Sequence, residues 1–413
     1  MCFRYNCKFK GITHSDQLTV QSNNIIKILE NKKAQSFIRS NINGDIAVLA
    51  LKNRAETSYN MTECLQLIKI YKKAIKKLPL FWNNLLAIDE RSYAQCTSEA
   101  VAQYKSSFLS GNRLLDLTGG IGVDSLFLKN SFKDVIAIEH NDDLHQIASY
   151  NIEKLGVKNV LRIKSDALTY LKEYVSLSDL IYIDPDRRSE FGRSVALEHL
   201  SPNVLELLPL LKKRTKQVYL KLSPLFDVKE VYRRFSNVQC IFLIAEKGEI
   251  KEVGVWLDFS LVDNKSVIHL KDVSYDFDHT IEGITRRKEN GRLEKAENLH
   301  LPLALVAKSR SSANFLEGIE YHKHSDFEVY YSNESHIVGF RSFKIVGISR
   351  LAKKKVAKML ADAGIQKCTI IVKGSNQKAE EWHKKLKTKD GGDVYLILFQ
   401  DKTTEAVLAQ LIS

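Results

Sequence analysis

Short apolar segments alternate with helix-like segments between residues 114 and 259, and this alternation most narrows what the chain can fold into. Strands that alternate with helices are typical of a mostly parallel sheet with helices on both faces. The first segment, Leu-Leu-Asp-Leu at 114–117, is mostly apolar without alternation, as a central strand buried on both sides should be. The predicted strands are 114–117, 134–139, 160–163, 180–183, 217–222, 240–245 and 253–259. The pattern predicts an α/β domain with a Rossmann-like, seven-stranded sheet.

The rest of the chain is predicted to form three other parts. Residues 1–93 space their apolar side chains as helices do at 24–37 and 62–77, with Thr62 as a cap and Pro79 as a stop, and are expected to be a helical accessory domain. The sheet domain occupies 94–260, and 261–339 is expected to be a linker or a small ferredoxin-like module. Residues 340–413 alternate strand and helix, with strands at 340–348, 367–373 and 394–400 and helices at 350–364 and 377–387, which predicts a small α/β domain.

Composition restricts the class of protein. Hydrophobic residues make up 44% and charged residues 27% of the 413 residues, which is a globular composition. No apolar run reaches the roughly 18 residues of a membrane span, and the N-terminus lacks a signal-peptide layout. Six cysteines form no Cys-x-x-Cys pair. We therefore expect a cytoplasmic protein with no membrane partner and no metal site.

The chain is strongly basic. It carries 62 Lys and Arg against 49 Asp and Glu, for a net charge of +13. Such a balance favours a polyanionic partner, either nucleic acid or an anionic membrane surface. Residues 344–413 hold 14 basic and 7 acidic side chains, over half of the total excess. A lysine-rich solvated surface is the alternative interpretation.

A glycine-rich bend follows the first predicted strand and precedes a helix. It reads Asp116-Leu-Thr118-Gly119-Gly120-Ile-Gly122-Val-Asp124. Glycines there let the backbone approach a ligand, and the start of the helix adds oriented N–H groups. Glu139 ends the second predicted strand, where a carboxylate can bind both hydroxyls of a ribose. A bend that serves chain geometry alone, followed by a solvated strand end, is the alternative.

Two kinds of nucleotide site compete at this bend. A dinucleotide site requires Gly-x-Gly-x-x-Gly, and the third position here is Ser125. A site for S-adenosylmethionine combines an acid before the glycines, a ribose-binding acid, an acid after the third strand and a reaction motif after the fourth. The chain supplies Asp116, Glu139, Asp166 and Asp184 in that order. All four lie at carboxyl ends of predicted strands, where open α/β sheets bind ligands, so S-adenosylmethionine is favoured.

With these motifs, residues 95–259 resemble class I S-adenosylmethionine-dependent methyltransferases. The resemblance implies that Asp116 and the backbone at 118–122 hold the methionine part, Glu139 the ribose and Asp166 the adenine. Thr97-Ser98-Glu99 is similar to the Thr-Pro-Glu segment of cap-trimethylguanosine synthases, which implies that Thr97 and Ser98 lie near the cofactor. The complete implied cofactor site is Thr97, Ser98, Asp116, Thr118, Gly119, Gly120, Gly122, Asp124, Glu139, Asn141, Asp166 and Ala167.

The implied transfer site is Asp184-Pro185-Asp186-Arg187. Methyltransferases of base amines carry Asp or Asn, Pro, Pro and an aromatic that stacks on the base, so Asp186 and Arg187 depart from the family. Thr118 also replaces the usual first glycine, which is tolerable where its side chain points away from the cofactor. Arg187 and Arg188 could bind a substrate phosphate, or they could belong to a surface loop paired with Glu190.

The C-terminal domain favours RNA as the partner. Lys353, Lys354, Lys355 and Lys358 would form a stripe on a helix that can contact phosphates. The order of elements, with Gly364 and residues 385–393, resembles THUMP-like domains attached to some bacterial methyltransferases, and THUMP domains bind RNA. We therefore expect a methyltransferase of an RNA base, in transfer or ribosomal RNA. The alternatives are a non-catalytic RNA-binding protein on a methyltransferase scaffold, and a methyltransferase of protein or small molecules.

Overall fold

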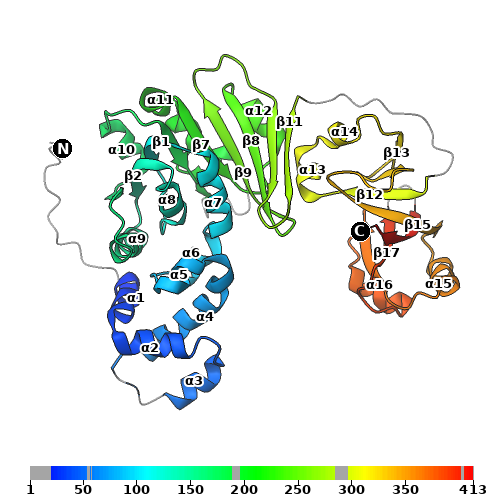
Figure 1. Ribbon diagram of the computed structural model, residues 1–413, viewed down its shortest axis with the longest axis horizontal. Helices are drawn as coiled ribbons and strands as arrows, with labels where there is room; N and C mark the ends of the chain where they lie inside the picture. Colours follow the sequence, from blue (N-terminus) through cyan, green and yellow to red (C-terminus); the bar gives the residue numbers. More distant parts are fainter. Residues whose placement is uncertain are drawn as a thin grey trace. The chain divides into compact units, whose positions relative to one another are not determined.

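The computed structural model describes residues 20–53, 56, 58–187, 196–283, 296–400 and 404–412. The chain divides into two compact units, Met1–Lys221 and Leu222–Ser413 (Figure 1). Within the described ranges, no helix is long and apolar enough to cross a membrane. The same ranges contain no group of three His, Cys, Asp or Glu side chains placed to hold a metal ion.

The first unit begins with helices, as the apolar spacing predicts. They are α1 (Val20–Glu30), α2 (Lys32–Ser40), α3 (Ile46–Lys52), α4 (Met61–Lys77), α5 (Pro79–Asn84) and α6 (Glu90–Gln95). Asn31 divides the single helix predicted at 24–37, because its side chain accepts two backbone N–H groups of α2, at 2.9 and 3.2 Å. Asn60 caps α4 instead of the predicted Thr62, accepting a backbone N–H at 3.3 Å.

A parallel sheet follows in the same unit, with the strand order β7-β4-β1-β2-β3. Its strands are β1 (Gly111–Asp116), β2 (Phe132–Glu139), β3 (Val160–Lys164), β4 (Leu180–Ile183) and β7 (Gln217–Leu222). The helices around it are α7 (Glu99–Phe108), α8 (Val123–Leu128), α9 (Asp142–Lys154), α10 (Ala167–Glu173) and α11 (Val204–Arg214). A short ladder joins β5 (Asp186–Arg187) to β6 (Leu200–Ser201) after the 3₁₀ turn at Leu197–His199. The α/β fold predicted for this region is confirmed.

The N-terminal helices bind the sheet domain through α9. The Asn151 amide forms two hydrogen bonds with the backbone of Ala87, at 2.7 and 2.9 Å, and all of these atoms are buried. At the other end of α9, Ser22 donates its N–H to Asp143 at 3.1 Å and its hydroxyl to Gln146 at 2.8 Å. These two buried hydrogen bonds hold the segment around Ala87 against α9, because leaving either group unpaired would be costly.

The second unit contains two groups of strands. Its first group runs in the order β11-β10-β8-β9. Here β8 (Val238–Glu246) pairs antiparallel with β9 (Glu249–Asp258) and parallel with β10 (Val267–Asp272), and β11 (Phe277–Glu282) pairs antiparallel with β10. The helix α12 (Val228–Arg234) precedes them. The strands β8 and β9 were predicted, whereas β10 and β11 lie in the segment expected to be a linker or ferredoxin-like module.

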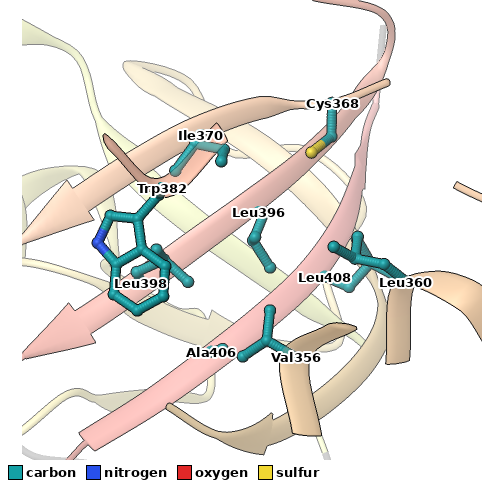
Figure 2. Close-up of a cluster of buried hydrophobic side chains, with 9 residues drawn as sticks. All are labelled: Val356, Leu360, Cys368, Ile370, Trp382, Leu396, Leu398, Ala406 and Leu408. Atoms are coloured by element: carbon teal, nitrogen blue, oxygen red, sulfur yellow. The ribbon is translucent and has the colours of Figure 1, made fainter. Parts of the chain in front are cut away.

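The second group forms a sheet with the order β13-β14-β12-β15-β18-β17-β16. Its strands are β12 (Asn298–Pro302), β13 (Tyr321–Lys323), β14 (Tyr330–Ser332), β15 (Phe340–Arg350), β16 (Thr369–Lys373), β17 (Val394–Gln400) and β18 (Thr404–Leu411). The helices are α13 (Ala304–Ser309), α14 (Ser312–Phe315), α15 (Lys353–Asp362) and α16 (Ala379–Leu386). Figure 2 shows Trp382 of α16 and Val356 of α15 over the buried side chains of this sheet.

Two features of this sheet differ from the sequence expectation. The strand β18 was not predicted, yet it lies between β15 and β17 and pairs with both. Residues 298–332 contribute β12, β13 and β14 to the same sheet. Of the strands within 261–339, β10 and β11 therefore belong to the first group, and β12, β13 and β14 belong to the second. The boundaries of the four expected domains stay a prediction. Gly364, at a φ of +70°, ends α15 as predicted.

Candidate functional site

A cavity of about 450 Å³ lies at the carboxyl ends of β1, β2, β3 and β4. Its size is within the usual range for small-molecule sites, roughly 300–1,000 Å³. Open α/β sheets bind their ligands at this edge. The structure brings twelve of the sequence-predicted residues to its wall. They are Thr97, Asp116, Thr118, Gly119, Gly120, Gly122, Asp124, Glu139, Asp166, Ala167, Asp184 and Asp186.

The glycine bend forms the floor between β1 and α8. Gly120 and Gly122 have φ angles of +46° and +87°, in the left-handed region that side chains with a Cβ adopt only with strain. Gly119 has a different reason for being glycine. A Cβ there would come within 2.2 Å of Nη1 of Arg162 and 3.1 Å of the Ile138 carbonyl oxygen. The bend therefore depends on backbone freedom at two positions and on close packing at the third.

Asp116 ends β1 with only 2% of its surface exposed. One carboxylate oxygen accepts the N–H of Thr118 at 3.0 Å, and the other accepts the Ser125 hydroxyl at 2.6 Å. Burial raises the pKa of Asp116 to about 6, although these hydrogen bonds and nearby Arg162 act in the opposite direction. A buried carboxylate without a directly bound cation is a site where a cationic ligand group gains most.

Glu139, at the end of β2, binds the backbone of the glycine bend. It is 5% exposed, and its carboxylate accepts the N–H of Gly120 at 2.8 Å and the N–H of Asn141 at 2.7 Å. The glycine bend and the second acid are thus joined directly. The Asn141 side chain caps α9 by accepting the Leu144 N–H at 3.1 Å, and Asn141 is not part of the cavity wall.

Arg162 of β3 contacts the glycine bend through its guanidinium group. The sequence did not mark it as a site residue. Its Nη2 donates to the Gly120 carbonyl at 2.8 Å. Its Nε and Nη1 are buried and have no hydrogen-bond partner among the described residues. Burial lowers the pKa of Arg162, and the carboxylates of Asp116 and Glu139 oppose that change. The signal was a charged residue in the middle of a predicted strand.

Thr118 connects the end of β1 with the end of β4. Its hydroxyl oxygen accepts the backbone N–H of Asp184 at 2.7 Å. The sequence suggested only that a side chain here must avoid the cofactor, but the structure gives it a positive task. By holding the Asp184 backbone, Thr118 sets the position at which the implied transfer motif begins.

A charged cluster joins three residues of the cavity wall, Thr97, Asp124 and Asp184, to two lysines that are not part of the wall, Lys105 and Lys221. Lys105 of α7 is fully buried and donates to Asp124 at 2.8 Å, with the Tyr182 hydroxyl also at 2.8 Å. The Thr97 hydroxyl donates to the other oxygen of Asp124 at 2.9 Å. Burial acts to raise the pKa of Asp124, but Lys105 and Lys221 outweigh it and hold that pKa at about 2.

Lys221, near the end of β7, is the other residue that the sequence did not assign. Its ammonium group binds the Asp184 carboxylate, donates to the Thr97 hydroxyl at 3.0 Å and lies 4.0 Å from Asp124. Its position beside the cleft could be inferred from its place near the carboxyl end of the fifth predicted strand, 217–222. Its partners could not, because they lie 37 and 124 residues away in the chain.

Of the remaining predicted site residues, some line the cavity and others do not. Asp166 caps α10, accepting the Thr169 N–H at 2.9 Å, and lines the cavity. Ser98 caps α7 by accepting a backbone N–H at 3.4 Å and is not part of the wall. Pro185 is also absent from the wall. The side chain of Arg187 and all of Arg188 and Glu190 lie outside the described residues.

The start of α11 and the residues just before it also line the cavity, a contribution that was not predicted from the sequence. Asn203 caps this helix by accepting a backbone N–H at 3.1 Å and donates its amide N–H to Glu206 at 2.9 Å. Both residues line the cavity, together with Ser201, Pro202 and Leu207. No described aromatic side chain lines this wall beside Asp184 and Asp186.

Comparisons with known proteins agree with this architecture. Residues 340–410 match the family described as THUMP domain-like. The fold is similar to the crystal structure of a candidate methyltransferase from Porphyromonas gingivalis W83, with a TM-score of 0.76 and 22% identity, over 94% of this chain and 99% of that chain. The chain has a methyltransferase fold with N-terminal helices and a C-terminal THUMP-like domain.

Shorter stretches are similar to curated proteins. An uncharacterised RNA methyltransferase of Mycoplasma mobile is 34% identical over 116 residues, which cover 28% of this chain and 29% of the relative. An uncharacterised RNA methyltransferase of Prochlorococcus marinus is 33% identical over 76 residues, or 18% of each protein. The chain thus matches less than a third of the length of these relatives.

Proposed function

We propose that the chain is an S-adenosylmethionine-dependent methyltransferase that acts on a base of RNA. One observation carries the proposal: the acids at the ends of β1, β2, β3 and β4 line a single cavity of about 450 Å³ beside the glycine bend. The methyltransferase fold supports it. The names of the two partial relatives support RNA as the substrate.

The residues present fit the cofactor. Buried Asp116, whose pKa is raised, suits the ammonium group of the methionine part. Glu139 can accept the two ribose hydroxyls, because its carboxylate is fixed by the N–H groups of Gly120 and Asn141. Asp166 lies exposed at the start of α10, where it can accept an amino group of adenine. When bound, S-adenosylmethionine supplies a methyl group already activated by its sulfonium.

Asp184 is the residue that would meet the acceptor. It lines the cavity, its backbone is held by Thr118 and its carboxylate by Lys221. A carboxylate held in this way can accept an N–H of a base and so fix the direction of the nitrogen lone pair. Methyl transfer needs little more than this alignment, since proximity and orientation can supply much of the barrier reduction. Asp186 would provide a second acceptor at the same wall.

The THUMP-like domain would hold the RNA. Lys353, Lys354, Lys355 and Lys358 are all exposed on α15. Lys355 and Lys358 also line a groove of about 460 Å³, together with Val346, Met359 and the acidic Asp362. Several exposed lysines on one helix can neutralise several phosphates. The remaining basic residues of 344–413 would add to this contact.

Two measurements test the proposal. Calorimetric titration with S-adenosylhomocysteine should show binding, and Asp184→Ala should retain that binding while losing methyl transfer. Mass spectrometry of nucleosides from a strain lacking the gene and from its parent should show one missing methylated nucleoside. A strain with an unchanged nucleoside profile, together with normal transfer by Asp184→Ala, would contradict the assignment.

A second candidate is a non-catalytic RNA-binding protein on the same scaffold. It is favoured by Asp186 and Arg187, which stand where base-amine methyltransferases have proline and an aromatic. This candidate expects no calorimetric signal even at millimolar S-adenosylhomocysteine, while RNA still binds. A methyltransferase of protein or small molecules would instead bind the cofactor and leave the RNA nucleosides unchanged.

A further inference from the structure

Lys221 joins two residues of the cavity wall, Thr97 and Asp184. Its ammonium group binds one oxygen of Asp184, on the acceptor side, and donates to the Thr97 hydroxyl at 3.0 Å, on the cofactor side. It also lies 4.0 Å from Asp124. Lys221 is not part of the cavity wall, so we expect it to act on a substrate through the wall residue Asp184.

The charges of this cluster balance. Asp124 already has a cation in Lys105, which is 2.8 Å away and fully buried. Asp184 has Lys221. The Lys221 side chain is 12% exposed, whereas 36% of the Asp184 side chain remains exposed toward the cavity that it lines. A carboxylate with one oxygen bound from behind keeps its second oxygen for a ligand.

We infer that Lys221 is a positioning residue that fixes the Asp184 carboxylate for the methyl acceptor. This inference rests on the proposed function. Without the ammonium group, the Asp184 side chain can leave the rotamer that it holds, and its free oxygen no longer points at one place. Because a misplacement of about 1 Å can cost about a hundredfold in rate, the effect should appear in turnover and not in binding.

Lys221→Met tests the inference, since methionine keeps the length and apolar stem of lysine but loses the charge. The probe is total RNA from a strain lacking the gene, with radiolabelled S-adenosylmethionine as the methyl donor. We expect the apparent kcat to fall about 10- to 100-fold. The apparent KM for both substrates and the affinity for S-adenosylhomocysteine should stay within about twofold. Lys221→Arg should recover much of the rate, because a guanidinium can bind the same carboxylate.

Lys216→Met is the matched control. Lys216 is exposed and directly precedes β7, so its substitution removes the same charge from the opposite end of the same strand, away from Asp184. Its kcat should equal that of the parent protein. A loss in this variant as large as that of Lys221→Met would show that the effect is one of general charge, and would overturn the inference.

A double substitution separates positioning from folding. Asp184→Asn retains one oxygen acceptor and therefore some activity, and adding Lys221→Met to it should cost little more. An equal fractional loss in both backgrounds would mean that Lys221 does not act through Asp184. A parent protein that methylates nothing contradicts the proposed function itself. An active parent beside an equally active Lys221→Met contradicts only the role of Lys221.

Discussion

Asp116→Asn should make the cofactor-free protein more stable at neutral pH. Asp116 is 2% exposed, and burial raises its pKa from 3.8 to about 6. At about 1.4 kcal/mol per pKa unit, this rise corresponds to about 3 kcal/mol of unfavourable free energy once the group is ionised in the folded protein. Asparagine keeps both hydrogen bonds, because its oxygen can accept the Thr118 N–H and its amide can donate to the Ser125 hydroxyl.

The sign of the pH dependence follows from proton binding. Between pH 4 and 6 the folded protein holds the Asp116 proton more tightly than the unfolded chain does. This tighter proton binding adds to the free energy of unfolding. The added free energy is therefore fully present below about pH 4 and is lost as the pH rises through about 6. Asp116→Asn removes this dependence, so its stability relative to the parent should grow between pH 4.5 and pH 7.5, by about 1–3 kcal/mol.

Urea unfolding at these two pH values measures the difference. Other shifted groups, such as Glu99 with its pKa raised to about 6 by burial, are present in both proteins and cancel. Asp134→Asn is a suitable control, since the Asp134 side chain is 61% exposed and should change stability by less than about 0.5 kcal/mol. An Asp116→Asn protein that loses as much stability at pH 7.5 as at pH 4.5 would refute the reasoning. Affinity for S-adenosylmethionine should fall at least about tenfold in Asp116→Asn, as expected for a lost charged contact.

Three further changes test other parts of the structure. Lys105→Met should cost about 3 kcal/mol in urea unfolding, because the Asp124 carboxylate, which is 12% exposed, loses its ion pair at 2.8 Å and keeps the more distant Lys221 at 4.0 Å; parental stability would contradict this. Gly119→Ala should weaken S-adenosylhomocysteine binding in calorimetry, since its Cβ would come within 2.2 Å of Arg162 and displace the bend, and unchanged affinity would show that the bend can yield. Alanine at Lys353, Lys354, Lys355 and Lys358 together should flatten the slope of log RNA affinity against log salt by about two to three units, at roughly 0.7 per phosphate contact. An unchanged slope would mean that these lysines are merely solvated, and cofactor affinity serves as the control.

Much of the fold follows from local sequence pattern. The apolar runs and their alternation with helices located every strand of the parallel sheet, because a buried strand must be apolar wherever it lies in the sheet. The same logic located the acids at the ends of β1, β2, β3 and β4 that line the cavity, since carboxyl ends of parallel strands share one edge. Helix caps were less well determined: Asn60 replaces Thr62, because several neighbouring polar residues can each accept the first N–H groups.

The pairing of strands and charges was decided only by the tertiary structure. Nothing in the local pattern of β18 shows that it lies between β15 and β17. Lys221 is an ordinary lysine in sequence, and its role comes from Asp184, 37 residues earlier, and Thr97, 124 residues earlier. The physical reason is that periodicity records which face of an element is buried, whereas an ion pair depends on which other elements the topology brings to that face.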